Sequence, residues 1–379
     1  MTPRSSPVSA RTTSTKGNKP LAEKALIAMS GGVDSSVAAL LMQRDGYDCM
    51  GVTMKLYEGE TAPGSKTCCT ADDAADARSV AYRLGMPYYV FNMKEDFDRQ
   101  VIARFVSTYE AGATPNPCID CNRYLKFSLL REKGQALGCS MIATGHYARV
   151  ERRDDGRWLL KKAVNEEKDQ SYVLYTLTQQ ELAHTRFPLG GMTKTQVRAM
   201  AEENGLLNAH KQDSQDICFV PDGDYAAFIR RYTGRDYPAG DFVDENGKVL
   251  GRHRGQICYT VGQRRGLGVA ADRPLYVCKK RLEENQIVLT GNEKLFSRRL
   301  IARDINLIPF DHLDKPIRCK ARVRYKHAEQ PATVTQIGED MIEVVFDEPQ
   351  RAITAGQAVV LYDGDLVLGG GTICDTEES

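Results

Sequence analysis

The sequence predicts an α/β protein: a doubly wound parallel-sheet domain, then a small mixed domain, then an antiparallel β-barrel. Apolar strand-like runs alternate with helical stretches from residue 25 to about residue 150, which is typical of a parallel sheet with helices on both faces. Glycines are dense between residues 234 and 268, and β-branched, alternating segments dominate the last part of the chain. These changes divide the chain into residues 1–20, 21–222, 223–292 and 293–379.

The first domain is expected to contain four strands alternating with four helices. The strands are residues 25–29, 50–55, 88–92 and 141–144, and the helices are residues 35–44, 72–84, 95–110 and 123–137. Gly46, Gly85 and Gly138 each fall where a helix should end, because glycine readily adopts the left-handed conformation that closes many helices.

The carboxyl ends of these strands are the expected binding site. Ligands of open parallel sheets bind outside those ends, beside the point where the strand order reverses. Residues 30–35, Met54 and residues 145–146 lie at or just after the ends of three predicted strands. We therefore expect them around one crevice.

The remaining elements are a hairpin, further helices and the barrel strands. Residues 148–163 predict a hairpin, and residues 168–184, 193–205 and 225–232 predict helices. The last strands are residues 317–325, 332–337, 341–346, 358–362 and 365–368. A small closed barrel pairs such strands without leaving an exposed edge.

Residues 30–35, with the sequence SGGVDS, join the first strand to the first helix. Glycines let backbone N–H groups approach an anion, and the helix N-terminus adds the positive end of its dipole. No lysine follows the glycines, so this is not the GxxxxGK[ST] loop. The segment resembles the pyrophosphate loop of the ATP pyrophosphatases, which split ATP into AMP and pyrophosphate. The alternative is an ordinary glycine turn in which Ser35 caps the helix.

Composition narrows the class of protein. The 51 Lys and Arg residues nearly balance the 50 Asp and Glu residues, so any affinity for nucleic acid must come from local patches. No apolar run approaches the roughly 18 residues that span a bilayer, and we expect a soluble protein without a membrane partner.

Eleven cysteines, an odd number at irregular spacing with no signal peptide, favour a reducing, cytoplasmic setting. Residues 1–20 are expected to be a disordered tail rather than a transit peptide.

Three cysteines stand out chemically. Cys118 and Cys121 form a Cys-x-x-Cys pair behind two prolines, and Cys218 follows much later in the chain. We expect Cys121 to open the helix of residues 123–137, where the helix N-terminus lowers the pKa of a thiol and improves it as a nucleophile or metal ligand. The pair alone is compatible with zinc, a redox disulfide, an iron–sulfur cluster, sulfur carriage or two structural thiols.

Several motifs occur together in one order. They are SGGVDSS at residues 30–36, TPNPCIDCN at 114–122, ATGHYAR at 143–149, KDQSYVLY at 168–175, DSQDICF at 213–219, TVGQRRGLG at 260–268 and GQAVVLY at 356–362, followed by GGG. In this set the chain closely resembles the tRNA-specific 2-thiouridylases, which thiolate the wobble uridine of certain tRNAs. The resemblance covers about residues 24–373.

The resemblance implies a role for residues in each motif. The implied ATP contacts are Ala28, Met29, Ser30, Gly31, Gly32, Val33, Asp34, Ser35, Met54 and Gly145. The implied contacts with the target base are Asn116, Pro117 and Cys118, and those with tRNA are His146, Lys168, Asp169, Gln170, Arg324, Tyr325 and Gln357. Cys121 matches the nucleophile and Cys218 the carrier of the persulfide, and these two are expected to form a redox disulfide. For His146, a buried core histidine is the alternative.

One position departs from the commoner family pattern. Many members have Asp where this chain has Cys118, and that carboxylate is proposed to act as an acid or base. The thiol here leaves open an iron–sulfur cluster held by Cys118, Cys121 and Cys218, with one iron free to bind sulfide. The other implied cofactors are ATP and Mg²⁺, with Asp34 helping to organise the metal.

The expected reaction replaces the C2 oxygen of uracil by sulfur. That oxygen departs poorly, so adenylation supplies AMP as the leaving group, and paired cysteines deliver sulfur protected from water. The expected partners are the anticodon stem–loop of tRNA and a sulfur-donor protein such as a cysteine desulfurase or a relay carrier, and we expect a monomer. An amide-forming ATP pyrophosphatase and a non-catalytic, nucleotide-binding redox sensor are the competing hypotheses.

Overall fold

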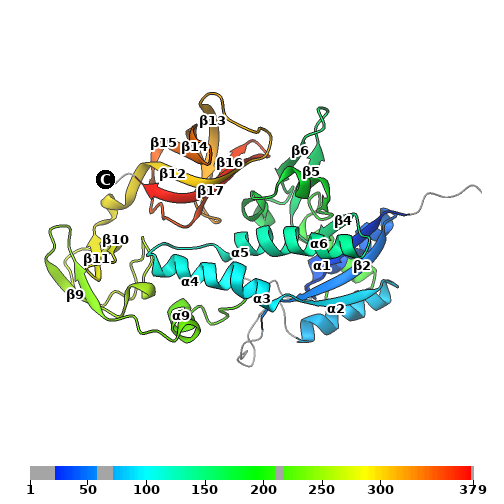
Figure 1. Cartoon of the computed structure of the whole chain (residues 1–379), viewed down its shortest axis with the longest axis horizontal. Helices are drawn as coiled ribbons and strands as arrows, with labels where there is room; N and C mark the ends of the chain where they lie inside the picture. Colours follow the sequence, from blue (N-terminus) through cyan, green and yellow to red (C-terminus); the bar gives the residue numbers. More distant parts are fainter. Residues whose placement is uncertain (1–21, 58–70, 210, 212–216, 377–379) are drawn as a thin grey trace, which may run out of the picture.

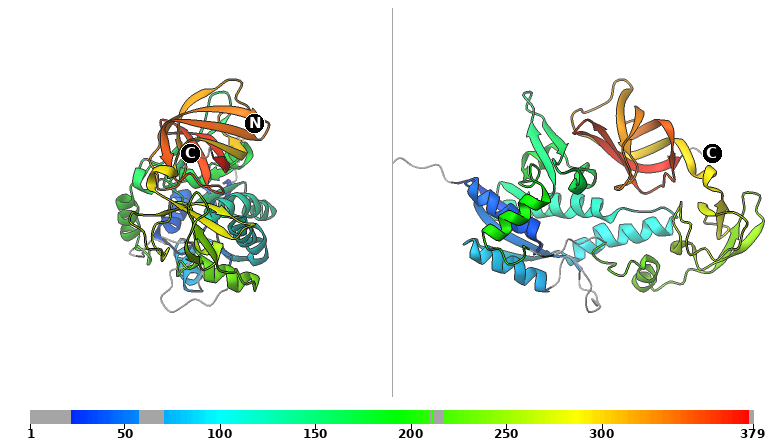
Figure 2. Two further views of the ribbon diagram at one scale, coloured as in Figure 1. Left: turned by 90° about the vertical axis from the view of Figure 1, so that its left-hand side faces the viewer. Right: turned by 180° about the vertical axis from the view of Figure 1, so that it is seen from behind.

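The computed structural model describes residues 22–57, 71–209, 211 and 217–376, which form a sheet domain, a central domain and a barrel (Figure 1). The predicted tail at residues 1–20 and residues 213–216 of the DSQDICF motif lie outside the described residues. Viewed from behind, the sheet domain and the central domain lie at opposite ends of the molecule, and the barrel lies above the helices that connect them (Figure 2). Within the described ranges, no helix is both long enough and apolar enough to cross a membrane.

The sheet domain contains five parallel strands in the order β3-β2-β1-β4-β7. Their bounds are β1 Lys24–Ala28, β2 Asp48–Lys55, β3 Tyr88–Asn92, β4 Met141–Thr144 and β7 Thr185–Arg186. The predicted parallel sheet is confirmed, and the order reverses between β1 and β4. Strand β7 was not predicted, because two residues are too short to show a periodic pattern.

Helices cover both faces of this sheet. Ile27 of β1 packs with Val37 and Val80 in one core cluster, whereas its neighbour Leu26 packs with Leu130 in another. Adjacent side chains of a strand point to opposite faces, so this alternation makes the domain doubly wound, as predicted. The helices on the face of Ile27 are α1 Val33–Arg44, α2 Ala71–Arg83 and α8 Lys194–Glu203.

Two longer helical runs are interrupted by π-helical turns. The first comprises α3 Lys94–Phe97, η1 Asp98–Ile102 and α4 Ala103–Glu110, and the second comprises α5 Pro117–Asp120, η2 Cys121–Leu129 and α6 Leu130–Ala136. The second run begins earlier than the predicted start at residue 123. Pro117 occupies its first turn, where a missing N–H costs nothing and the fixed φ suits the helix.

The predicted hairpin is confirmed as β5 Ala148–Arg152 and β6 Trp158–Lys162. The single helix predicted over residues 168–184 is wrong. The structure has two 3₁₀ turns, η3 Glu166–Lys168 and η4 Ser171–Leu174, followed by α7 Gln179–Ala183. The Asp169 carboxylate accepts hydrogen bonds from the backbone N–H groups of Ala163 and Ser171, which holds the segment as a loop.

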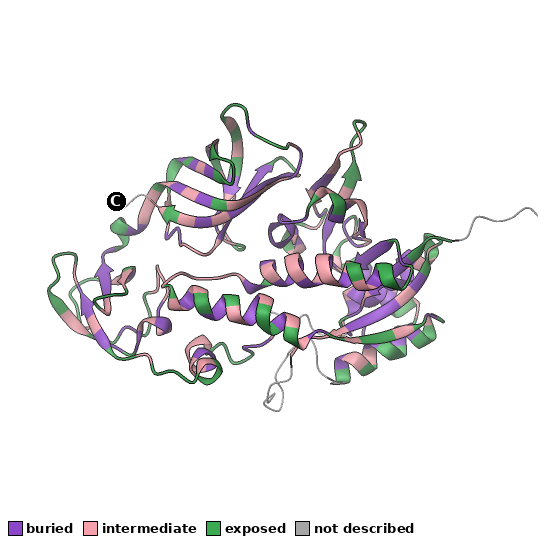
Figure 3. Ribbon diagram, viewed as in Figure 1, coloured by how far each residue is buried: buried purple, intermediate pink, exposed green. Residues whose placement is uncertain are grey.

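The central domain and the barrel complete the chain. The central domain contains α9 Tyr225–Thr233, η5 Gln256–Cys258, β8 Gly240–Val243, β9 Val249–His253, β10 Tyr276–Arg281 and β11 Gln286–Thr290. The barrel contains, after the turn η6 Asn292–Leu295, β12 Phe296–Leu307, β13 Ile317–Arg322, β14 Gln330–Gly338, β15 Met341–Arg351, β16 Ala358–Asp363 and β17 Leu366–Thr376. Pairing of β12 with β17 closes the predicted barrel, and buried residues concentrate along its strands and those of the sheet (Figure 3). Strand β12 was not predicted.

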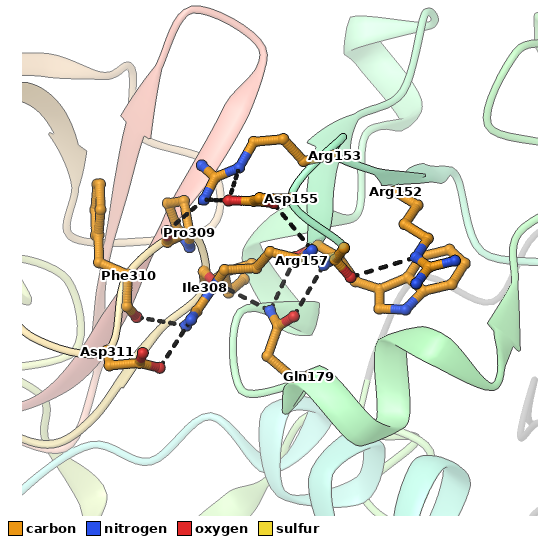
Figure 4. Close-up of polar contacts among 11 residues, drawn as sticks. Arg152, Arg153, Asp155, Arg157, Gln179, Ile308, Pro309, Phe310 and Asp311 are labelled. Atoms are coloured by element: carbon orange, nitrogen blue, oxygen red, sulfur yellow. Dashed lines mark hydrogen bonds and ion pairs between the residues drawn. The ribbon is translucent and has the colours of Figure 1, made fainter.

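The hairpin also ties the sheet domain to the barrel. Arg157 donates hydrogen bonds to the carbonyl oxygens of Ile308 and Phe310, each at 2.7 Å, and to the carboxylate of Asp311 at 2.8 Å (Figure 4). Gln179 donates to the same Ile308 carbonyl at 3.0 Å. The barrel is therefore fixed to the domain that carries the glycine loop.

Candidate active site

The glycine loop is closed by its own serines. Ser35 accepts a hydrogen bond from the Ser30 backbone N–H at 3.2 Å and donates one to the Gly32 carbonyl at 3.0 Å. Helix α1 has Gly32 as its N-cap and no side-chain cap. Ser35 therefore shapes the loop instead of capping the helix, and the first N–H groups of α1 have no intrahelical partner. This arrangement favours the anion-binding interpretation over the simple turn.

Two glycines, Gly31 and Gly145, pack closely against neighbouring backbone and place the loop at the point where the strand order of the sheet reverses. Gly31 has φ +75°, and a Cβ atom there would lie 2.3 Å from the Asp73 carbonyl oxygen. A Cβ atom on Gly145, which follows β4, would lie 2.8 Å from the Ser35 backbone nitrogen. The structure thus brings Gly145 against the loop as expected, while Met54 lies near the carboxyl end of the neighbouring strand β2.

Asn208 anchors the loop from behind. Its side-chain amide donates to the Gly31 carbonyl at 3.0 Å and to the Ser36 hydroxyl at 2.8 Å, and Asn208 is buried. Asn208 was not predicted, because it lies in a turn after α8 that has no motif or periodic pattern.

Asp34 is held by two residues that the sequence analysis did not assign. The Lys194 ammonium lies 2.8 Å from each carboxylate oxygen of Asp34, and the Tyr147 hydroxyl donates to one of them at 2.8 Å. The lysine that the glycine loop lacks thus comes from the start of α8. A Mg²⁺ ion at Asp34 would have to share this carboxylate with an ammonium group, so the arrangement does not fit the metal role expected for Asp34.

The two cysteines of the Cys-x-x-Cys pair occupy different surroundings. Cys118 lies in the first turn of α5 and is exposed, whereas Cys121 lies one turn later and is buried. The expectation that Cys121 opens the helix is wrong, because the helix begins at Pro117. The first-turn position, which favours a negative charge, belongs to Cys118.

Cys121 and Cys218, far apart in sequence, belong to one apolar cluster. Cys121 is part of its buried core and Cys218 packs against that core, with Phe105 and Phe219 among the members. The rings of Phe105 and Phe219 meet edge to face at 5.2 Å. The fold therefore brings these two thiols to one apolar region, in which Cys121 is buried and Cys218 is half-buried.

The three cysteines proposed as cluster ligands lie in two kinds of surroundings. Cys118 is exposed outside the apolar cluster that contains the other two cysteines. Within the part of the chain that the structure describes, no three His, Cys, Asp or Glu side chains are grouped so that they could hold a metal ion. The iron–sulfur alternative stays a prediction.

Tyr325 of the barrel meets the segment of residues 168–170, which is also expected to contact tRNA. The Tyr325 side chain is partly exposed, and its hydroxyl donates to the Asp169 carbonyl at 3.1 Å. Burial first, then the Asp169 carboxylate and the nearby Cys118, raise the pKa of Tyr325. Gln170 follows Asp169, and Lys168 precedes it at the end of η3. The sheet domain and the barrel thus meet at two residues that are expected to contact tRNA.

Three other residues expected to contact tRNA make internal contacts. His146 is buried, with Nδ1 2.7 Å from the Thr144 hydroxyl oxygen, and burial together with Lys126 holds the pKa of its imidazole well below the usual value. These contacts match the core-histidine alternative. Gln357 donates to the carbonyl oxygens of Thr114 and Pro115 at 2.9 and 3.1 Å, which ties the barrel to the target-base segment.

Arg324 joins the barrel to the central domain. Its guanidinium donates to the Thr354 hydroxyl at 2.7 Å and to the Ala352 and Val261 carbonyl oxygens at 3.1 and 3.3 Å. Burial lowers the pKa of this guanidinium. Its contact with tRNA, like those of His146 and Gln357, stays a prediction.

A cavity of about 580 Å³ lies between α4, α5 and the barrel strands β12 and β17. Its wall contains Asn116 of the target-base segment, the carboxyl of Asp120, and three arginines, Arg104, Arg123 and Arg303. Burial raises the pKa of Asp120 to about 6, although Arg104 and Arg123 act in the opposite direction. Asp304 also lines the cavity and pairs with Arg123, so the helix that carries the cysteines lines a cavity of mixed charge.

Comparison with known proteins gives consistent matches along the chain. Residues 23–222 match a tRNA methyl transferase HUP domain, residues 226–290 a tRNA methyl transferase PRC-barrel domain and residues 297–373 an aminomethyltransferase β-barrel domain. The chain is 48% identical to the tRNA-specific 2-thiouridylase MnmA of Clostridioides difficile, over 93% of this chain and 98% of that protein. It is 50% identical to the protein of the same name from Carboxydothermus hydrogenoformans, over 93% of this chain and 97% of that protein.

Solved structures with lower similarity were also found. A 4-thiouridine synthetase–RNA complex with bound ATP has a TM-score of 0.36 and 18% identity, over 52% of this chain and 44% of that one. An NMN synthetase from Francisella tularensis has a TM-score of 0.32 and 15% identity, over 57% of this chain and 79% of that one.

Proposed function

The chain belongs to the family of tRNA-specific 2-thiouridylases, and we propose that it converts the wobble uridine of tRNA to 2-thiouridine through an adenylated intermediate and a cysteine persulfide. It is a tRNA sulfurtransferase that uses ATP. The observation that carries the finer proposal is the shared apolar cluster of Cys121 and Cys218, in the same domain as a phosphate-binding loop.

In the first step the C2 oxygen of uracil attacks the α-phosphorus of ATP. The bond between the α-phosphorus and its bridging oxygen breaks, and pyrophosphate leaves. The amides of residues 30–32 and the N-terminus of α1 would hold the pyrophosphate. Lys194, 2.8 Å from Asp34, is close enough to this loop to stabilise the charge on the leaving group.

In the second step a persulfide on Cys218 attacks C2, and AMP leaves with the former C2 oxygen. The Cys121 thiolate then attacks Sγ of Cys218. This breaks the S–S bond between Cys218 and the transferred sulfur, which stays on C2. The 2-thiouridine is released, and a Cys121–Cys218 disulfide forms, which an external thiol must reduce before the next cycle. A sulfur-donor protein would regenerate the persulfide.

The test measures the products of ATP cleavage and of tRNA thiolation in the same reaction. Unmodified tRNA, ATP and a persulfide donor should yield AMP, pyrophosphate and 2-thiouridine, quantified by chromatography and by mass spectrometry of digested tRNA. Cys121→Ser and Cys218→Ser should each abolish thiolation while tRNA-dependent pyrophosphate release continues. Cys319→Ser, on barrel strand β13, is the matched control and should retain thiolation.

Each competing hypothesis predicts a different outcome. Pyrophosphate release that does not respond to tRNA would favour an enzyme acting on a small molecule. ATP binding without pyrophosphate release would favour a nucleotide-binding redox sensor. Near-normal 2-thiouridine in either site mutant would remove that cysteine from the mechanism.

A further inference from the structure

We propose that Tyr147 is a positioning residue that couples RNA binding at residues 169–170 to the Asp34 carboxylate in the glycine loop. The proposal rests on the function proposed above and concerns the regulation of the same site. It assigns a role to a residue that the expected ATP and tRNA contacts do not include.

On the phosphate side, Tyr147 contacts the loop directly. Its hydroxyl donates to Oδ1 of Asp34 at 2.8 Å, the same oxygen that accepts from Lys194 at 2.8 Å. The Lys194 ammonium also lies 6.0 Å from the centroid of the Tyr147 ring. The Tyr147 hydroxyl thus sets the orientation of the Asp34 carboxylate. The other partner of this carboxylate is Lys194, the lysine proposed above to stabilise the leaving pyrophosphate.

On the RNA side, Gln170 makes two hydrogen bonds with the backbone of Tyr147. The Gln170 backbone N–H donates to the Tyr147 carbonyl at 2.9 Å, and the Tyr147 backbone N–H donates to the side-chain oxygen of Gln170 at 3.0 Å. Gln170 adjoins Asp169, whose carbonyl accepts from the Tyr325 hydroxyl. Any RNA contact that shifts residues 169–170 therefore acts on Tyr147 through two hydrogen bonds.

The middle of the link is screened from water. Tyr147 is 2% exposed and packs in the core cluster that contains Val33 of α1, and Asp169 is 6% exposed. Buried side chains move between discrete arrangements more readily than they deform. Coupling between two binding sites is reciprocal, so ATP should strengthen RNA binding by the same factor by which RNA strengthens ATP binding.

The experiment measures that factor. The affinity for α,β-methylene-ATP, which resists the cleavage under study, is determined with and without an anticodon stem–loop bearing an unmodified wobble uridine. We expect RNA to tighten analogue binding by at least about fivefold in the parent protein, as is usual for coupled sites. In Tyr147→Phe, which keeps the ring but removes the hydroxyl, the factor should fall to about one while the stem–loop still binds.

Tyr237→Phe is the matched control, because its hydroxyl also donates to a carboxylate, that of Glu110 at 2.6 Å, but outside this chain of contacts. It should keep the coupling factor of the parent. An unchanged factor in Tyr147→Phe, or a parent protein in which the two ligands bind independently, would overturn the proposal. Failure of the parent to form 2-thiouridine would instead contradict the proposed function, since coupled binding can be measured without turnover.

Discussion

The glycine loop and the cysteine segment belong to the same domain but are built in opposite ways. The loop is a continuous stretch, residues 30–35, whose hydrogen bonds close on its own serines. The cysteine chemistry instead depends on Cys121 and on Cys218, which another part of the chain brings to the same apolar cluster. Binding a phosphate needs backbone amides at one turn, whereas passing a sulfur atom between two thiols needs tertiary contact.

The two regions should therefore differ in tolerance to substitution. Close backbone packing against Asp73 leaves Gly31 of the loop no space for an added methyl group. The first turn of α5 places Cys118 at an exposed position, where side chains of similar size can be exchanged. The following substitutions test this difference, beginning with the largest expected effect.

Gly31→Ala should abolish ATP-dependent chemistry. The new Cβ would lie 2.3 Å from the Asp73 carbonyl oxygen, and φ +75° is itself unfavourable for alanine by about 1–2 kcal/mol. We expect pyrophosphate release to fall by more than about 100-fold, together with reduced thermal stability. Gly46→Ala is the control, because Gly46 has φ +88° but no atom within 4 Å of its added Cβ. Equal activity losses in both variants would show that backbone strain, not the loop's packing, is responsible.

Lys194→Ala should slow pyrophosphate release by roughly 100-fold, the usual cost of losing one preorganised group at a developing charge. The loss should appear in kcat, because the leaving group gains its charge in the transition state. Lys211→Ala is the control, since Lys211 pairs with Asp73 and Asp76 at 2.7 and 2.6 Å instead of with Asp34. If Lys194→Ala changes only the KM for ATP, the lysine binds substrate without stabilising the leaving group.

Asp120→Asn should change the pH dependence of stability. Burial raises the pKa of this carboxyl from 3.8 to about 6, so the folded state holds a proton that the unfolded state releases between those values. The stability of the parent should therefore fall as the pH rises from about 4 to 6, and the variant should lack this fall. At 1.36 kcal/mol per pKa unit, the variant should gain roughly 3 kcal/mol at pH 7.5. Urea unfolding at pH 4 and pH 7.5 measures this gain, and equal differences at both pH values would contradict it.

Cys118→Asp should have the smallest effect on thiolation, a loss of less than about tenfold. The first turn of a helix favours a negative charge, and a carboxylate can shuttle a proton. The variant also restores the residue that many family members have at this position. Thiolation and iron content of anaerobically purified protein are measured together. An inactive, iron-free variant beside an active, iron-loaded parent would instead favour the cluster mechanism.

Strong local patterns predicted much of the fold. The strands β3 and β4 have the predicted bounds, and Gly46, Gly85 and Gly138 have the positive φ values expected of helix ends. Prediction failed where buried side chains overrode the local pattern. Tyr172 and Leu174 lie within the predicted helix of residues 168–184, but the structure buries both fully in the 3₁₀ turn η4, which follows the hydrogen bonds of the Asp169 carboxylate.

The sequence by itself determined the glycine loop, because the residues that close it lie within a single turn of chain. It also identified the cysteines and the motifs of the family. Only the tertiary structure decided that Lys194 and Tyr147 meet Asp34, that Cys121 and Cys218 share an apolar cluster, and that Tyr325 meets Asp169. These contacts join segments whose separation along the chain leaves no periodic signal. They form because parallel strands, helix packing and barrel closure bring their ends to the same place.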